Sequence, residues 1–263
     1  MPVYLFKGQT LKVVHFALLF FVFFGIYSCS EEPTTSKGEL ATVEERVSGD
    51  VKAFELAEKV LEAAGGREAW DNTRYIHWNF FGMRELLWDK WEQKVRIDSK
   101  SPRIEAILDL KTKEGTIRSA LSNKLGKDVL RQKVYEIWVN DSYWLVLPFK
   151  LLDPGVRLQY LGRDSSGQFE QIELTFDTVG LTPQNKYILS IDPSNNRIIE
   201  WSYFADAEDE KARFTMAWGG YGQYGDIWLS ANRGSNRSIS DIWVAQDIDS
   251  MVMKDLDTPI PDR

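Results

Sequence analysis

The chain has 263 residues, of which 43% are hydrophobic, 13% aromatic and 27% charged. Its length suits one large domain or two small ones, and its aromatic content favours a packed core over a disordered chain. The formal net charge is −7. An acidic chain with no basic tract repels phosphate backbones, so we expect no nucleic acid among its partners.

The N-terminal region begins with a charged and then an apolar segment. Residues 1–12 carry two lysines, and residues 13–27 form an apolar run that only His15 and Gly25 interrupt. A membrane-spanning helix needs about 20 residues, so this shorter run is typical of a secretory signal peptide. The alternative is a signal anchor that is never cleaved.

The apolar run ends at Ile26-Tyr27-Ser28-Cys29, which resembles a bacterial lipobox. An apolar residue stands three positions before the cysteine and a small one directly before it, although Tyr27 is bulkier than usual. The resemblance implies removal of residues 1–28 and acylation of Cys29. Each buried CH₂ group contributes about 0.8 kcal/mol, so two or more acyl chains anchor a protein stably to a membrane. We therefore predict an envelope lipoprotein anchored to the outer membrane through Cys29.

A polar tether and one folded domain are expected after the cysteine. Residues 30–50 are acidic and contain Pro33, Gly38 and Gly49, a composition that is typical of a flexible linker. We assign residues 29–50 to the acylated N-terminus and tether. Residues 51–263 are assigned to a single domain.

Two helices are predicted in this domain. Asp50 is a suitable N-cap, apolar residues from Val51 onward recur at helical spacing, and Gly65-Gly66 end the helix. A short helical turn is expected at residues 67–72. Residues 126–141 also carry apolar side chains at helical spacing, which predicts a second helix in the middle of the chain.

The remaining sequence is typical of strands. From Tyr75 onward apolar residues recur at every second position, which indicates antiparallel strands with one buried and one polar face. The alternation is clearest at residues 94–98, 156–162, 171–177, 199–204 and 213–218. Residues 164–167 and 192–196 are predicted to form hairpin turns. The glycine-rich stretch 218–226 lacks the lysine of a phosphate-binding loop, and we expect a loop or bulge there.

The order of helix, strands, helix and strands contains no βαβ alternation, which argues against a parallel α/β fold. We predict a mainly β, α+β fold. Its core would be a strongly curved antiparallel sheet, or half-barrel, of about a dozen strands with two or three lid helices.

Three segments carry a family resemblance: AEKVLEAAGGREAWDNTRYIHWNFFG, WVNDSYWLVLPFKLLDPGVRLQYLG and FDTVGLTPQNKYILSIDP. They resemble an uncharacterised family of bacterial outer-membrane lipoproteins, which in turn is similar to the LolA/LolB-like lipoprotein-carrier half-barrel. In such a half-barrel, helices cover a bent sheet whose concave face shelters acyl chains. The resemblance therefore implies a lipid-binding fold, and it carries no catalytic motif.

Histidine and cysteine are too scarce for the common catalytic and metal sites. Cys29 is the only cysteine, and His77 is the only histidine after the apolar run. A zinc site needs more such ligands. A catalytic triad would have to use His77, but the chain has no nucleophile elbow, so we predict a structural histidine in a sheet. No nucleotide or calcium motif occurs either, and we expect no enzymatic activity, cofactor or metal. The alternative is a hydrolase, which would require paired carboxylates, or a serine beside His77, in an open cleft.

The function predicted from these observations is binding of a lipid or other apolar ligand, without catalysis, in the concave face. The candidate ligand-binding side chains are the inward apolar residues of the strands, and the open alternative is that they merely pack under the helices. A second hypothesis is a structural lipoprotein that recognises an envelope protein or a glycan. The candidate residues are Leu158, Tyr160, Leu174, Phe176, Ile199, Trp201, Phe214, Met216 and Trp218.

Overall fold

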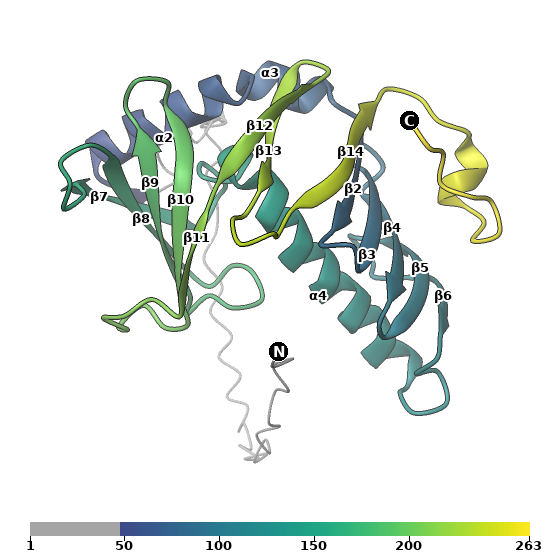
Figure 1. Cartoon of the computed structure of the whole chain (residues 1–263). Coiled ribbons are helices and arrows are strands. Elements are labelled where there is room, and N and C mark those ends of the chain that lie inside the picture. The colour runs from purple at the N-terminus through teal and green to yellow at the C-terminus, as the bar shows by residue number, and fades with distance from the viewer. Residues whose placement is uncertain (1–47) are drawn as a thin grey trace, which may run out of the picture. The chain divides into compact units, whose positions relative to one another are not determined.

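The computed structural model describes residues 48–263, which belong to one compact unit (Figure 1). In this part of the chain, 14 strands are accompanied by three α-helices and two short 3₁₀ helices. All strand pairs but one are antiparallel. The predicted mainly β fold with about a dozen strands and two or three helices is therefore confirmed.

After the short strand β1, the elements follow one another as a helical pair, five strands, a long helix and eight further strands. Their bounds are β1 (Ser48–Gly49), α2 (Val51–Ala63), α3 (Gly66–Asn72), β2 (Tyr75–Phe80), β3 (Arg84–Asp89), β4 (Lys94–Lys100), β5 (Arg103–Asp109), β6 (Gly115–Ser119), α4 (Lys127–Val146), η1 (Leu147–Phe149), β7 (Val156–Arg163), β8 (Glu170–Phe176), β9 (Lys186–Asp192), β10 (Arg197–Phe204), β11 (Phe214–Ala217), β12 (Gly219–Tyr224), β13 (Ile227–Asn232), β14 (Ile239–Ala245) and η2 (Ser250–Met253).

Helix α2 begins and ends as its sequence predicts. The Asp50 side chain accepts a hydrogen bond from the backbone N–H of Ala53 at 2.7 Å, and its second oxygen accepts one from Tyr160 of β7 at 2.6 Å. The cap therefore also joins the helix to the sheet. At the other end Gly65 has φ +117°, and a Cβ there would lie 2.5 Å from the carbonyl oxygen of Asp226. Only glycine fits this junction.

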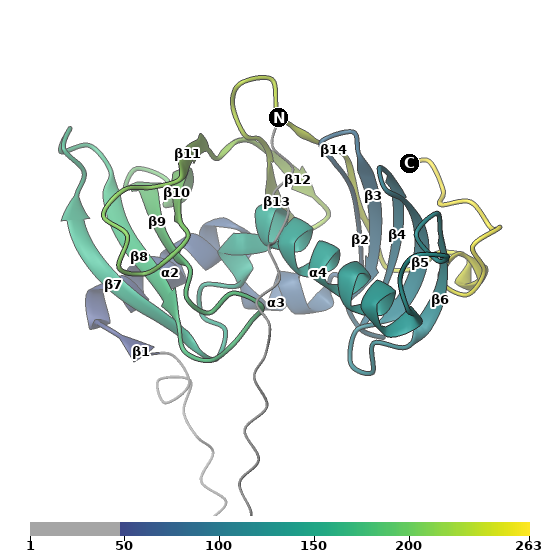
Figure 2. The same cartoon turned by 90° about the horizontal axis from the view of Figure 1, so that it is seen from below.

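The strands are divided among two six-stranded sheets and one two-stranded ribbon. The order in sheet A is β1-β7-β8-β9-β10-β11, and the order in sheet B is β14-β2-β3-β4-β5-β6. The ribbon β12-β13 lies between them, since β12 contacts both β10 and β14. Figures 1 and 2 show the three sheets as one curved, unclosed series with helix α4 on its inner side.

The ribbon corrects one prediction. Residues 218–226 were expected to form a loop or bulge, but residues 219–224 form strand β12 and pair with β13. The glycines allow this because Gly220 adopts φ +63° and Gly222 packs under the ring of Tyr224. Glycines at these positions interrupt the alternation of large apolar side chains, so the sequence pattern does not indicate this strand.

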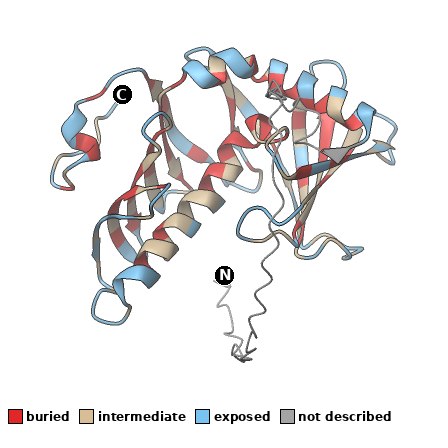
Figure 3. Cartoon of the chain, turned by 180° about the vertical axis from the view of Figure 1, so that it is seen from behind, coloured by how far each residue is buried: buried red, intermediate tan, exposed pale blue. Residues whose placement is uncertain are grey.

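Helix α4 contacts both sheets, and this explains its length. The prediction ended the helix at residue 141, whereas it continues to Val146. Val134 and Trp138 pack in the core of sheet B, while Tyr143 and Trp144 reach the core of sheet A. Its apolar side chains therefore do not form a single stripe. Figure 3 shows buried residues along α4, whereas the exposed residues of α2 face away from the strands.

The C-terminal segment, residues 246–263, packs on the outer face of sheet B. It forms a small apolar cluster with the sheet, in which Val252 and Met253 meet Tyr75 and Leu87. The alternating pattern predicted a polar outer face, yet Arg96 of β4 is buried there. In residues 48–263, no helix is both long enough and apolar enough to cross a membrane.

Candidate functional site

A group of partly exposed aromatic side chains lies on the inner face of sheet A. Phe176 ends β8, Tyr187 stands at the start of β9, Tyr203 lies near the end of β10, and Phe214 begins β11. Tyr187 pairs with Tyr203, and Tyr203 with Phe214, in the strand register. These residues therefore meet at one end of the sheet, on the same face.

Helix α4 completes this group with Tyr143 and Trp144. The ring of Tyr143 lies 5.8 Å from Tyr187, and the ring of Trp144 lies 5.9 Å from Phe214. Tyr203 and Phe214 stack at 5.1 Å. We call these six side chains the aromatic surface: Tyr143, Trp144, Phe176, Tyr187, Tyr203 and Phe214.

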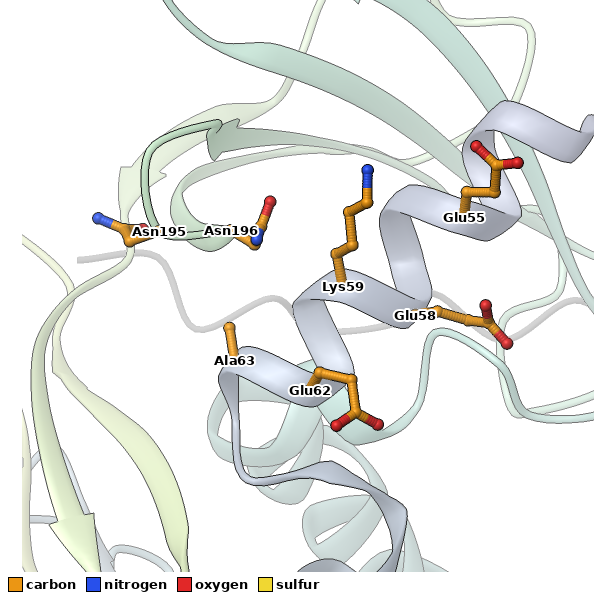
Figure 4. A pocket seen from close by; sticks show the side chains of 7 residues that line it. All are labelled: Glu55, Glu58, Lys59, Glu62, Ala63, Asn195 and Asn196. Atoms are coloured by element: carbon orange, nitrogen blue, oxygen red, sulfur yellow. The ribbon is translucent and has the colours of Figure 1, made fainter.

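The aromatic surface is partly exposed because helix α2 covers the opposite end of the sheet. Figure 4 shows α2 beside the turn between β9 and β10, where Lys59 and Asn196 line an open hollow of about 490 Å³. Three glutamates and Ala63 also line that hollow. The aromatic surface lies at the other strand ends, next to the connections 177–185 and 205–213.

One hydroxyl group inside the aromatic surface has no hydrogen-bond partner. The Tyr143 oxygen is buried, and no described atom donates to it or accepts from it. Burial raises the pKa of Tyr143 well above its usual value, with a smaller effect of Tyr187. A buried unpaired hydroxyl costs roughly 1–3 kcal/mol. A polar group of a bound molecule at this position would remove that cost.

Eight of the nine candidate ligand-binding residues lie in or against one core cluster. Leu158, Leu174, Trp201 and Trp218 are buried in it. The other four pack against it and are partly exposed, namely Tyr160, Phe176, Phe214 and Met216. Only Phe176 and Phe214 belong to the aromatic surface, so most of the predicted set packs under the helices or beside them.

The ninth candidate, Ile199, stands apart from this cluster. The register of β9 and β10 shifts between Ile198 and Glu200, and Ile198 is the residue that enters the core. A β-bulge adds one residue to a strand and so changes which side chain faces inward. Alternation across 199–204 cannot reveal a bulge that begins at Ile198.

Four members of the aromatic surface were absent from the predicted set. Tyr187 and Tyr203 follow the alternation of their strands, and that signal was sufficient to find them. Tyr143 and Trp144 lie beyond the predicted end of the second helix, so their approach to sheet A could not be inferred from the helical pattern.

A buried cation is hydrogen-bonded to the backbone of Trp144, one member of the aromatic surface. Arg233, which follows β13, is 1% exposed, and its guanidinium carbon lies 3.8 Å from the centre of the Trp218 ring. It donates hydrogen bonds to the carbonyl oxygen of Trp144 and to Ser230 and Asn232. Burial lowers its pKa to about 9. No pattern in the sequence distinguishes this arginine from the others.

His77 has the hydrogen bonds and ring packing expected of a structural histidine in a sheet. One ring nitrogen lies 2.6 Å from the carbonyl oxygen of Asp241, and the other lies 2.9 Å from a carboxylate oxygen of Glu85. The ring also stacks on Trp243 at 4.8 Å. Both nitrogens are engaged with groups other than a serine hydroxyl.

A second hollow, of about 710 Å³, lies on the outer face of sheet B. Three carboxylates stand side by side in its wall, because the strand register pairs Glu85 with Asp98 and Asp98 with Glu105. Burial raises the pKa of Asp98, and the neighbouring acids add to this effect. Arg96 and Arg118 offset the acidic charge. Among residues 48–263, no three His, Cys, Asp or Glu side chains are grouped to hold a metal ion.

The predicted signal peptide, the lipid anchor at Cys29 and residues 29–47 of the tether lie outside the described residues. They remain predictions, as do the boundaries of the folded domain.

Solved structures similar to this chain include three from bacteria. A DUF1329 family protein from Desulfovibrio piger is 10% identical, with a TM-score of 0.40 over 77% of this chain and 95% of that chain. An outer membrane lipoprotein-sorting protein domain from Vibrio parahaemolyticus is 11% identical, with a TM-score of 0.38 over 77% and 96%. A LolA superfamily protein from Nitrosomonas europaea is 11% identical, with a TM-score of 0.36 over 75% and 96%.

No protein-family model and no curated protein matches this sequence. All three TM-scores lie below 0.5, so the function must come from the residues of this chain.

Proposed function

We propose that this protein binds an apolar ligand, without catalysis, on the aromatic surface of sheet A. The observation that carries this proposal is the grouping of six partly exposed aromatic side chains at the one end of the sheet that α2 leaves uncovered. Contiguous apolar surface of this kind marks a binding site in soluble domains. Scattered exposed apolar residues would need no such explanation.

The energetics favour an apolar occupant. Covering apolar area stabilises a complex by roughly 25 cal/mol per Å², and aromatic rings offer large areas at little entropic cost. Val179 and Leu181, in the connection after β8, are exposed apolar residues near the same end of the sheet. They extend the apolar surface that a ligand with an alkyl chain would contact.

The proposal is tested with a neutral fluorescent probe, N-phenyl-1-naphthylamine, titrated into the domain. Replacing Phe214 by Ser should weaken binding about tenfold, since one ring contact of about 1.4 kcal/mol corresponds to that factor. Trp91→Ser is the matched control, because Trp91 is also aromatic and is 54% exposed on another surface. Equal affinity of wild type and Phe214→Ser, or loss of binding in the Trp91 variant alone, would contradict the proposal.

We also propose that the chain is a bacterial envelope lipoprotein whose Cys29 carries the acyl chains. The lipobox-like residues 26–29 support this assignment. The acylated form should have a mass higher than the unmodified cleaved chain, and it should sediment with membranes. Cys29→Ala should abolish both properties, whereas an unchanged mass and membrane retention would refute the anchor.

A further inference from the structure

Arg233 is unusual among the arginines of the described chain because it is buried without a carboxylate. Residues 48–263 contain two buried arginines, Arg96 and Arg233. Arg96 has a carboxylate oxygen of Asp98 at 3.2 Å. The partners of Arg233 are backbone carbonyls, the Ser230 hydroxyl and the Trp218 ring. Its positive charge is therefore not neutralised by any described residue.

One donor of this guanidinium is also unused. The buried Nε–H of Arg233 has no hydrogen-bond partner among the described atoms. Removing a charge from water is costly, and that cost is fully offset only by an opposite charge in good geometry. The lowered pKa of Arg233, about 9, has the same physical origin, since burial disfavours its charged form.

The position of this charge connects it to the aromatic surface. Arg233 donates to the backbone oxygen of Trp144, whose own ring belongs to that surface. On the other side, its guanidinium lies over Trp218, which contacts Trp201 at 5.5 Å. Trp201 in turn contacts Trp144 at 4.6 Å. The cation is therefore connected to the proposed binding surface through the Trp144 backbone and through the Trp218 and Trp201 rings.

We propose that the ligand is an anionic amphiphile, with its charged oxygens on Arg233 and its apolar chain on the aromatic surface. This inference rests on the proposed function and adds the ligand class. The Nε–H of Arg233 donates to the head group, and the two charges neutralise each other in a site with little water. Because Arg233 is 1% exposed and the Trp218 ring lies over its guanidinium, entry of the head group includes displacement of that ring.

The experiment compares three ligands with equal alkyl chains, namely dodecanoate, dodecan-1-ol and dodecyltrimethylammonium, below their aggregation concentrations. Wild-type protein should bind dodecanoate about tenfold more tightly than the alcohol, a factor that corresponds to one charge-assisted contact. The cationic ligand should bind more weakly than the alcohol. Affinities come from calorimetry, and the displacement of the Trp218 ring should change the tryptophan fluorescence.

Two variants test whether Arg233 causes the preference for dodecanoate over the alcohol. Arg233→Gln should lower the affinity for dodecanoate about tenfold and leave the affinity for the alcohol unchanged. Arg233→Lys, which retains the charge, should keep part of the preference. Thermal unfolding of each variant checks that it folds, and the wild-type comparison of the three ligands needs no variant.

The outcomes separate this inference from the function on which it rests. Equal binding of dodecanoate and the alcohol by the wild type, or a preference that persists in Arg233→Gln, would overturn the anionic ligand but leave the apolar site intact. Failure of all three ligands and of the neutral naphthylamine probe to bind would overturn the proposed function itself.

Discussion

Among single residues, Arg84 is expected to have a large effect on the stability of the core. It donates to both oxygens of Asp141, at 2.6 and 2.9 Å, and thereby joins strand β3 to helix α4. The Asp141 side chain is 1% exposed. Loss of one partner of a buried ion pair leaves an uncompensated charge in the core. This destabilises the fold more than replacing both charged residues by apolar ones.

We therefore expect Arg84→Met to lower the free energy of unfolding by about 3–5 kcal/mol, as measured by urea denaturation. The double variant Arg84→Met/Asp141→Leu should recover most of this loss, because it removes both charges. A double variant as unstable as the single one would show that the pair itself, rather than the orphaned carboxylate, determines the loss.

Glu85 should make stability depend on pH. Its hydrogen bond with His77 lowers the pKa of the Glu85 carboxyl below its ordinary value. A lowered folded pKa means that the ionised group stabilises the fold above about pH 4.3, the ordinary value for glutamate, and that this contribution is lost as the pH falls.

The cost of Glu85→Gln should accordingly be largest at neutral pH and shrink as the pH falls below about 4.3. Urea unfolding of wild type and variant across that range measures the difference. Glu58→Gln, on the exposed side of α2, is the control and should show no such trend. A cost of Glu85→Gln that stays constant with pH would contradict the assignment.

For single residues, the sequence predicts which apolar side chains point into the core. It predicts less well which of these side chains remain accessible to solvent. Trp201 and Trp218 follow the strand period into the core, as expected. Ile199 does not, because a bulge changes the alternation. The Nε–H of Arg233 and the Tyr143 hydroxyl owe their significance to burial without a hydrogen-bond partner among the described atoms, and that property depends on segments far apart in the sequence.

At the scale of the elements, the buried Arg96 links the C-terminal segment to strand β4, beside the exposed ion pair of Arg118 with Asp257. The Arg96 guanidinium donates to the carbonyl oxygens of Val252 and Leu256, at 3.1 and 3.3 Å, and also to that of Thr258. A guanidinium offers five donors in a fixed fork, which suits several carbonyl groups at once. The segment has little other polar attachment to β4.

Arg96→Met should release this segment without unfolding the sheets. Hydrogen exchange of the amides in residues 250–258 should become faster, while exchange in β2 and β3 stays unchanged. Arg103→Met is the matched control, because the Arg103 side chain is 76% exposed and pairs only with Glu105. Unchanged exchange in residues 250–258 of the Arg96 variant would show that the apolar cluster and the Arg118–Asp257 ion pair hold the segment without Arg96.

The elements were predicted with unequal success, for identifiable reasons. Helix α2 has an N-cap, one apolar stripe and a glycine stop, and all three signals are local. Helix α4 was placed five residues short because its last turns face a different sheet from its first ones. Strand β12 was missed because its glycines carry no side-chain pattern.

At the scale of the whole molecule, the α+β class followed from the order of the elements and from two-residue alternation. Both signals are sums over many residues, so single errors do not change the result. The division into two sheets and a ribbon, and the face that α2 leaves uncovered, depend on contacts between distant strands. Those contacts decide where a ligand can bind, and no local pattern specifies them.

Binding at the aromatic surface is tested most directly by photocrosslinking with a diazirine-bearing alkyl probe. Peptide mass spectrometry then identifies the labelled residues. Labels should fall on Tyr143 and Trp144 and on the strand ends at Phe176, Tyr187 and Phe214, and excess dodecanoate should compete with them. Labels confined to other surfaces such as Trp91, or no competable label at all, would contradict the proposed function.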